Sequence, residues 1–219
     1  MTDAIAVEGL QVHYPASAFV LHLPALRVAR GEVLTIVGPS GCGKTTLLDC
    51  LAGIRRPQQG AIRILGTPLE GLSEAERRDL RLGSIGMVFQ DFCLLDHLSL
   101  EENILLPCRL GARLRLDATV RLRARDLAAA VGLEDRLRQR VHRLSQGERQ
   151  RVMICRALIT EPALILADEA TSSLDPVSTR MIEALLHRSV DERGATLLTV
   201  THDPATVARA GRVLDLAAA

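Results

Sequence analysis

Lysine is almost absent from this chain of 219 residues, although basic residues as a class are not. Among 27 Lys and Arg residues only Lys44 is a lysine, and 26 Asp and Glu residues leave a formal net charge of +1. A charge this close to neutral does not indicate a strongly basic nucleic-acid-binding protein. A preference for arginine codons accounts for the arginines, but it does not explain why one position stays lysine.

Aromatic side chains are also scarce, at 2% of the chain, with no Trp and a single Tyr. Stacking platforms for single-stranded nucleic acid are therefore largely excluded, and we expect no nucleic-acid partner. The five cysteines are an odd number without CxxC spacing, which argues against a disulfide framework or a zinc knuckle. We expect all five to be free thiols in a reducing compartment.

Long hydrophobic runs are missing as well. Uninterrupted apolar runs such as 163–167 fall far short of the roughly 20 residues that cross a bilayer. The first ten residues, MTDAIAVEGL, have neither the basic nor the apolar region of a signal peptide. We therefore expect a soluble, unexported protein in which 1–219 forms a single domain.

The only lysine stands inside a phosphate-binding pattern. Residues 38–45 read GPSGCGKT, a match to GxxxxGK[ST], and they follow an apolar, β-branched segment at 32–37. Residues 45–52 have helix-forming composition, so the order is strand, glycine-rich loop, helix. Backbone N–H groups of such a loop form an anion cradle, and the Thr45 hydroxyl is suited to ligate Mg²⁺. A compact ammonium fits between phosphate oxygens where a guanidinium does not, which explains the exception at Lys44.

Two further apolar segments predict buried strands that end in polar side chains. The first, 163–167, is followed by Asp168 and Glu169, and the second, 196–201, is followed by His202. Because ligands of open parallel sheets bind beyond the carboxyl ends of the strands, these side chains should converge on the phosphate loop. Asp168 would then hold the magnesium, and Glu169 would orient or deprotonate an attacking water.

Between these segments, 91–152 follows helical spacing. We expect it to be an inserted helical subdomain, with 1–90 and 153–219 as the nucleotide-binding core. Its stretch 109–143 holds 10 Arg against 4 acidic residues, a local excess of +6. This excess indicates either a solvated helix face or a surface oriented toward an anionic membrane.

Ser145 and Glu148 have the spacing of a helix capping box, as do 73–76 and 99–102. What distinguishes the box at Ser145 is Gly147, where the backbone can approach a ligand. The helix that follows should bury an apolar stripe of Val152, Cys155, Leu158 and Ile159.

Together, these motifs resemble the nucleotide-binding subunit of an ATP-binding cassette (ABC) transporter over nearly the whole chain. The resemblance implies an α/β fold: a P-loop NTPase (RecA-like) core with a mainly parallel sheet, an N-terminal antiparallel β portion and the inserted α-helical subdomain. It also implies that the chain is an ATPase that uses ATP and Mg²⁺.

The resemblance assigns roles to individual residues. It implies that Glu169, His202 and Lys44 are catalytic and that Thr45, Gln90 and Asp168 bind the metal. Tyr14 would stack on adenine, and 172–175 would face the dimer partner. The full set of implied nucleotide-binding residues is Tyr14, Gly38, Pro39, Ser40, Gly41, Cys42, Gly43, Lys44, Thr45, Thr46, Gln90, Ser145, Gly147 and Glu148. Three positions depart from the usual pattern, namely Gln146, Glu148 and Ala170, where the family more often has Gly, Gln and Pro.

The mechanism implied by the resemblance is a head-to-tail homodimer that drives an integral membrane permease from the cytoplasmic face of the inner membrane. Each ATP would be held by the phosphate loop of one subunit and the signature motif, 144–148, of the other. The segment 81–107 resembles the lipoprotein-releasing, macrolide-export and cell-division class. The ATPase of a small-solute importer is an alternative. A soluble ABC ATPase of DNA repair or translation is another, although this chain has neither a long coiled-coil insertion nor a second cassette.

Overall fold

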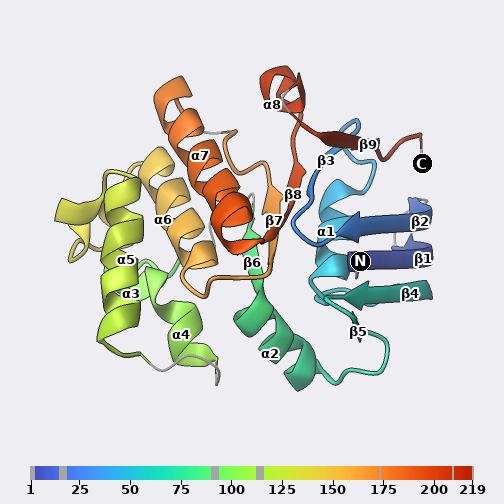
Figure 1. Ribbon diagram of the computed structural model, residues 1–219, viewed down its shortest axis with the longest axis horizontal. Coiled ribbons are helices and arrows are strands. Elements are labelled where there is room, and N and C mark those ends of the chain that lie inside the picture. The colour runs from blue at the N-terminus through green and yellow to red at the C-terminus, as the bar shows by residue number, and fades with distance from the viewer. Residues whose placement is uncertain are drawn as a thin grey trace.

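Two β-sheets form the framework of the computed structural model, which describes residues 3–14, 19–89, 94–111, 116–172, 174–208 and 210–218 (Figure 1). The larger sheet has five strands in the order β6-β7-β8-β3-β9, and every neighbouring pair is parallel. Its strands are β3 (Val33–Val37), β6 (Ile85–Val88), β7 (Leu164–Asp168), β8 (Thr196–Val200) and β9 (Arg212–Asp215).

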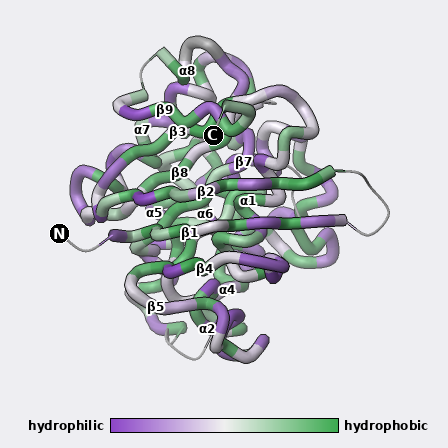
Figure 2. The backbone as a smooth tube through the Cα atoms, turned by 90° about the vertical axis from the view of Figure 1, so that its right-hand side faces the viewer, coloured by the Kyte–Doolittle hydropathy of each residue, from purple (hydrophilic) through white to green (hydrophobic). Residues whose placement is uncertain are grey.

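The smaller sheet is antiparallel and has the order β2-β1-β4-β5. In Figure 2 this sheet faces the viewer, with β1 between β2 and β4. Its strands are β1 (Asp3–His13), β2 (Val20–Ala29), β4 (Gln59–Ile64) and β5 (Thr67–Pro68). The mainly parallel sheet and the N-terminal antiparallel portion expected from the sequence are both confirmed.

Helix α1 (Lys44–Leu51) lies between the two sheets (Figure 1). Its apolar side chains pack with those of both sheets in one hydrophobic cluster. Along β7, Leu164 and Leu166 belong to that cluster, whereas Ile165 and Ala167 belong to a second cluster. Since successive side chains of a strand point to opposite faces, the parallel sheet is covered on both sides, as its apolar strands require.

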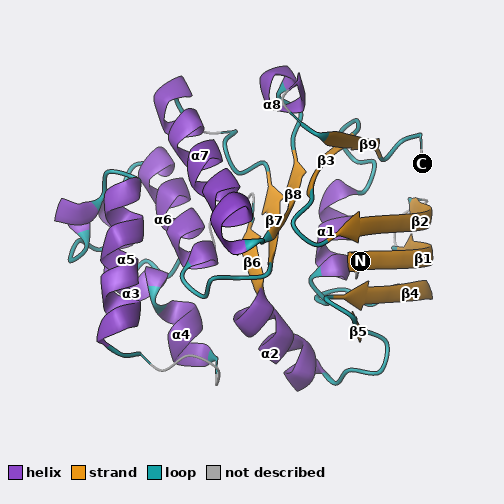
Figure 3. Cartoon of the chain, viewed as in Figure 1, coloured by secondary structure: helices purple, strands orange, loops and turns teal. Residues whose placement is uncertain are grey.

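Helices α6 and α7 cover the other face of the parallel sheet, and α3 and α5 pack against α6 (Figures 1 and 3). The helices after α1 are α2 (Glu74–Ser84), α3 (Leu100–Ile104), α4 (Leu106–Leu110), α5 (Ala118–Ala130), α6 (Gln146–Leu158), α7 (Pro176–Arg193) and α8 (Pro204–Ala208), with two 3₁₀ turns, η1 (Glu134–Arg136) and η2 (Val141–Arg143). Helices α3, α4 and α5 lie in the predicted helical subdomain. The boundary placed at 152 falls inside the continuous helix α6.

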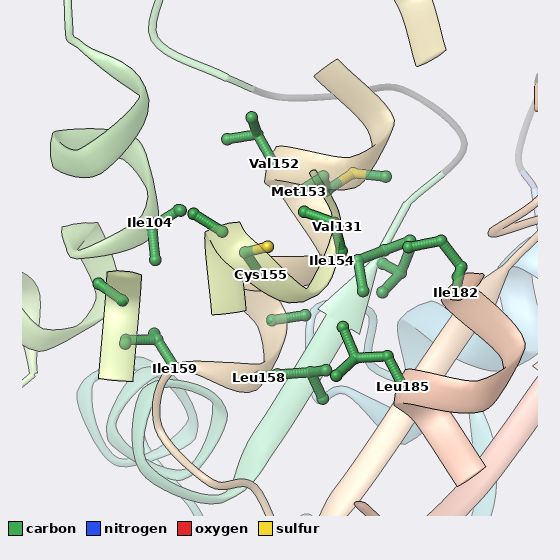
Figure 4. Close-up of a cluster of buried hydrophobic side chains, with 14 of the residues drawn as sticks. Ile104, Val131, Val152, Met153, Ile154, Cys155, Leu158, Ile159, Ile182 and Leu185 are labelled. Atoms are coloured by element: carbon green, nitrogen blue, oxygen red, sulfur yellow. The ribbon is translucent and has the colours of Figure 1, made fainter. Parts of the chain in front are cut away.

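The buried side of α6 carries the second hydrophobic cluster. The four residues of the predicted apolar stripe are at most 3% exposed. Figure 4 shows them beside side chains from α3 and α7, including Ile104 and Leu185. The helical period read from the sequence therefore identified a buried side of α6.

Local sequence signals also set the helix ends. All three predicted capping boxes are present, at the starts of α2, α3 and α6. The four described cysteines are free thiols, as expected, whereas Cys93 lies outside the described residues. Within the described ranges, none of the helices combines the length and hydropathy that a bilayer crossing needs.

Candidate nucleotide site

The glycine-rich loop joins the end of β3 to the start of α1. Gly38, Gly41 and Gly43 have φ angles of 148°, 81° and 101°, a region that favours glycine. A Cβ atom at Gly38 would lie 2.7 Å from the Cys42 sulfur, and one at Gly43 would lie 2.7 Å from Cζ of Phe19. The backbone conformation therefore favours glycine at these positions, and an added Cβ at Gly38 or Gly43 would require the neighbouring side chain to move.

Lys44 begins α1, and its ammonium group lies inside the loop. Its Nζ donates hydrogen bonds to the carbonyl oxygens of Gly38, at 2.8 Å, and Pro39, at 2.9 Å. The N-cap of α1 is Gly43, which has no side chain to accept from the first N–H groups of the helix. A cation beside these N–H groups has the properties of a phosphate cradle.

Thr45 and Asp168 meet across the edge of the parallel sheet. The Thr45 hydroxyl donates to Oδ2 of Asp168 at 2.7 Å. Asp168 is 4% exposed, and burial raises its pKa. The bond from Thr45 and the charge of Lys44 oppose this rise, and the charge of Glu169 adds to it. One hydroxyl and one buried carboxylate are oxygen donors of the kind that Mg²⁺ prefers when phosphates and water supply its other ligands.

Glu169 follows Asp168 in a strained backbone conformation, with φ of 50°. Its N–H donates to the carbonyl oxygen of Val200 at the end of β8, at 3.0 Å. Its Oε1 lies 2.9 Å from Nδ1 of His202, so the two groups predicted from separate strand ends are hydrogen-bonded. The Glu169 side chain is 19% exposed and the His202 side chain 70%, so this pair opens toward solvent.

Gln150 of α6 supports the turn after Glu169, and the sequence interpretation missed it. Its Nε2 donates to the carbonyl oxygens of Glu169, at 3.2 Å, and Ala170, at 2.6 Å. Gln150 is 3% exposed although it is polar. It lies four residues before Ile154 and therefore on the buried side of α6, which is the signal that could have identified it.

The loop that carries His202 has its own support. Oδ2 of Asp203 accepts from the N–H of Thr206 at 3.0 Å and lies 2.7 Å from the Thr206 hydroxyl. That hydroxyl also lies 2.9 Å from Oε1 of Glu183 on α7. These side chains tie the His202 loop to α7, and no motif in the sequence indicated them.

The signature motif begins α6. Ser145 is the N-cap, and its N–H donates to Oε2 of Glu148 at 2.8 Å. The other carboxylate oxygen of Glu148 accepts from Arg136 at 3.0 Å. Burial would raise the pKa of Glu148, but the hydrogen bonds from Ser145 and the charge of Arg136 hold it below its usual range. The carboxylate at this variant position is therefore paired on both oxygens.

One cavity of about 450 Å³ brings together seven of the fourteen nucleotide-binding residues that the resemblance implies. It is lined by Tyr14, Phe19, Ser40, Gly41, Gly43, Lys44, Thr45, Thr46, Asp168 and Glu169. His202 lines a neighbouring cavity that also includes Glu169. The structure does not bring the signature residues Ser145, Gly147 and Glu148 into either cavity. Gln90 lies outside the described residues, and so does Ser173 of the predicted dimer-facing loop.

The model of the ABC transporter family matches residues 21–172, which include the phosphate loop, the signature motif and the Asp168–Glu169 pair. This chain belongs to the ABC transporter family. Its ATP-binding fold accounts for the glycine-rich cradle and for the carboxylates beside it.

Relatives of two kinds are similar to this ABC protein. The methionine import ATP-binding protein MetN of Rhizobium etli is 44% identical over 200 residues, which cover 87% of this chain and 55% of MetN. The chain thus spans about half the length of this relative. The lipoprotein-releasing system ATP-binding protein LolD of Bordetella avium is 43% identical over 225 residues, covering 99% of this chain and 97% of LolD.

Solved structures have the same fold. The ATP-binding cassette MJ0796, in a dimeric post-hydrolysis state bound to ADP and Pi, has a TM-score of 0.87 and 30% identity, covering 96% of this chain and 93% of that one. The P-loop fold inferred from the motifs is therefore confirmed, including the antiparallel sheet and the helices that flank the parallel one.

Proposed function

We propose that this chain is the ATP-hydrolysing subunit of an ABC transporter. The observation that carries the proposal is the convergence of three features at one edge of the parallel sheet. These are the cradle around Lys44, the hydrogen-bonded pair of Thr45 and Asp168, and the pair of Glu169 and His202. A phosphate cradle, two oxygen ligands and a carboxylate held by an imidazole are the parts that hydrolysis of a nucleoside triphosphate requires.

In this proposal, the glycine-rich loop and the first residues of α1 bind the phosphates. The N–H groups near Gly43 would donate to phosphate oxygens, and the Lys44 ammonium would exchange its carbonyl partners for them. Thr45 and Asp168 would hold Mg²⁺, and Gln90 is the third ligand that the family resemblance implies. When bound, the ion neutralises phosphate charge.

Glu169 is the general base in this proposal. Its carboxylate would accept a proton from the attacking water, and the hydrogen bond to Nδ1 of His202 would fix its orientation. Gln150 and the Val200 carbonyl hold the strained backbone from which the carboxylate projects. The base is therefore positioned before substrate arrives.

The signature motif implies a second subunit. Ser145 and Gly147 lie at the N-terminus of α6, an end that favours anions, yet neither residue lines the cavity at Lys44. We infer that they contact the nucleotide of a partner subunit in a head-to-tail homodimer. The likeness to a dimeric cassette bound to ADP and Pi supports this inference.

A groove lined by Phe89, the residue before Gln90 in the sequence, is the proposed contact for the membrane permease. It has a volume of about 270 Å³, and its apolar lining includes Leu110, which is 64% exposed, and Phe89. Arg78, Arg81 and Arg156 also line it. We expect a permease segment with apolar side chains and at least one carboxylate to bind there. The chain would then lie at the cytoplasmic face of the inner membrane.

We propose the lipoprotein-release and export class for this permease because residues 81–107 resemble it. Similarity to LolD over 225 residues supports that choice. An importer remains a second candidate because identity to MetN is comparable, at 44%. The permease that co-purifies with the chain separates the two. A subunit with a large extracytoplasmic domain supports release or export, and a compact permease with a binding protein supports import.

Glu169→Gln tests the catalytic assignment. The amide keeps the shape and loses the base, so ATP binding should persist while turnover falls below about a tenth of wild type. ATP should then trap a dimer that size exclusion detects. Glu161→Gln is a matched control, because Glu161 has the same φ of 50° but pairs with Arg123 elsewhere. Loss of ATP binding, or turnover above that level, would contradict the role of Glu169.

Ser145→Arg tests the shared site. The variant should still bind ATP through Lys44 but should lose ATP-driven dimerisation and hydrolysis. A mixed dimer with Ser145→Arg on one chain and Lys44→Ala on the other leaves one composite site intact and should be active. Ser73→Arg, at the same capping position of α2, is the control for the helix cap. A wild-type chain that stays monomeric with ATP, yet hydrolyses it in proportion to protein concentration, would overturn the dimer proposal.

A further inference from the structure

The few aromatic side chains of this chain are unevenly placed. The sequence holds one Tyr and three Phe residues, and two of these four, Tyr14 and Phe19, line the cavity at the phosphate cradle. Their ring centroids are 6.1 Å apart and their planes are tilted by 52°. An apolar rim beside an anion cradle suits a ligand that joins a flat ring to phosphates.

Two contacts hold Tyr14 in place. Its hydroxyl lies 2.9 Å from Oγ1 of Thr46. The guanidinium carbon of Arg55 lies 4.4 Å from the centroid of its ring, within the range of a cation–π contact. Because Thr46 and Arg55 reach different parts of Tyr14, the position and the tilt of the ring are both fixed.

Both contacts come from the same structural unit. Thr46 is in the first turn of α1 and is 7% exposed. Arg55 follows the last turn of α1, and its N–H donates to the carbonyl oxygen of Asp49 in that helix, at 3.1 Å. Both contacts therefore connect the Tyr14 ring to α1, the helix whose N-terminus at Lys44 forms part of the phosphate cradle.

Arg55 contacts the ring of Tyr14 without lining the cavity at the phosphate cradle. Tyr14 lines the cavity, whereas Arg55 does not. Nε of Arg55 is buried and has no hydrogen-bond partner within the part of the chain that the structure describes. The guanidinium therefore packs on the ring with one of its donors unused, which is costly for a purely structural contact.

We propose that Arg55 is a positioning residue for the nucleobase. It holds the ring of Tyr14 flat against α1 so that the opposite face receives the base of the bound nucleotide. The inference rests on the proposed function, in which Tyr14 stacks on adenine. A ring that is already fixed loses less conformational entropy when the nucleotide binds. The affinity gained in this way concerns the base and does not concern the phosphates.

The experiment compares ADP with inorganic pyrophosphate, which has the phosphates and lacks the base. Dissociation constants for both ligands, with Mg²⁺, are measured by calorimetry on the full chain and its variants. Arg55→Ala should weaken ADP binding about fivefold and leave pyrophosphate binding unchanged. Arg55→Lys keeps the charge but loses the planar stack, so it should restore only part of the affinity. Arg56→Ala is the matched control, because Arg56 donates to the Leu72 carbonyl instead.

A double-mutant cycle with Tyr14→Ala tests whether Arg55 acts through the ring. Tyr14→Ala alone should weaken ADP binding about tenfold, the effect of losing one stacked base. In that background, Arg55→Ala should have no further effect. Thermal unfolding of each variant verifies that it is folded, and Arg55→Lys serves in place of Arg55→Ala if the latter is not.

Each other outcome contradicts a different statement. Unchanged or tighter ADP binding by Arg55→Ala, together with weaker binding by Tyr14→Ala, overturns the role of Arg55 and leaves base stacking intact. Tighter binding would mean that Arg55 occupies the place of the base. Equal weakening of ADP binding and pyrophosphate binding would also overturn the role of Arg55, because the substitution would then affect phosphate binding at the cradle. If Tyr14→Ala leaves ADP affinity unchanged, the stacking step of the proposed function fails.

Discussion

Asp168→Asn should make the protein more stable and inactive. The Asp168 carboxyl is 4% exposed, and burial together with the charge of Glu169 raises its pKa above the usual range, more than Thr45 and Lys44 lower it. The ionised group is therefore less favourable in the folded chain than in the unfolded one. Asparagine has nearly the same shape and can still accept the Thr45 hydroxyl, but it has no charge.

The pH dependence follows from the direction of this shift. Above its folded pKa the Asp168 carboxyl is ionised in the folded chain, and the full cost of burying that charge lowers the free energy of unfolding. As the pH falls through the folded pKa, the carboxyl takes up a proton and this cost is relieved. We therefore expect the variant to gain about 1 kcal/mol in free energy of unfolding near neutral pH, the usual size of a single stabilising substitution. For a chain of this size, that gain raises Tm by about 2–4 °C. The difference between variant and wild type should shrink as the solution is acidified.

Urea denaturation at several pH values, beside ATPase assays, measures both effects. Asp175→Asn is a control of opposite sign, because hydrogen bonds from Ser178 and Val177 lower the pKa of Asp175 to about 2. That variant should lose stability near neutral pH and approach wild type in acid. An Asp168→Asn protein that is less stable than wild type at neutral pH, or that keeps Mg²⁺-dependent turnover, would refute the reasoning.

Three further predictions concern the loop, the signature motif and the core. Lys44→Arg should lose ATP affinity although it keeps the charge, since the loop encloses an ammonium between the Gly38 and Pro39 carbonyls; near-normal affinity by calorimetry would contradict this. Arg136→Gln should weaken ATP-driven dimerisation up to about fivefold in light-scattering assays, because the Arg136 guanidinium offsets the charge of the partly buried Glu148 carboxylate near the proposed phosphate. Adding Glu148→Gln removes that charge and should restore dimerisation. Ile154→Ala, at 0% exposure in α6, should lower the free energy of unfolding by about 2–5 kcal/mol in urea titrations, and a change below 1 kcal/mol would show that the core refills the space.

The parts of the fold that the sequence predicted are those with local signals. The predicted strand at 163–167 is displaced by one residue in the structure, where β7 runs from Leu164 to Asp168 and includes the acidic residue itself. The predicted helix at 45–52 is α1, which begins and ends one residue earlier. In each case, a run of apolar residues that ends at a glycine or a polar residue was sufficient to predict the element. Both signals lie in residues that are neighbours in the sequence.

Contacts between distant segments could not be predicted in this way. Arg55 meets Tyr14, and Thr206 meets Glu183, only because the fold places separate helices and loops together. The sequence predicted that Glu169 and His202 lie at one edge of the sheet, since parallel strands end on the same side. It did not predict their hydrogen bond at 2.9 Å, which depends on the left-handed turn at Glu169.

Helix α6 connects two parts of the proposed site that the sequence analysis treated as separate motifs. Its N-cap, Ser145, belongs to the signature motif, and Gln150, five residues along, holds the carbonyl oxygens of Glu169 and Ala170. Five residues span about 7.5 Å of helix, and the buried stripe of α6 packs into the core, so we expect Ser145 and Gln150 to move as one body. A shift at Ser145 should therefore reach the backbone of the proposed general base through Gln150. In a head-to-tail dimer, where Ser145 would contact the partner's nucleotide, we expect binding in one site to affect the geometry of Glu169 in the other.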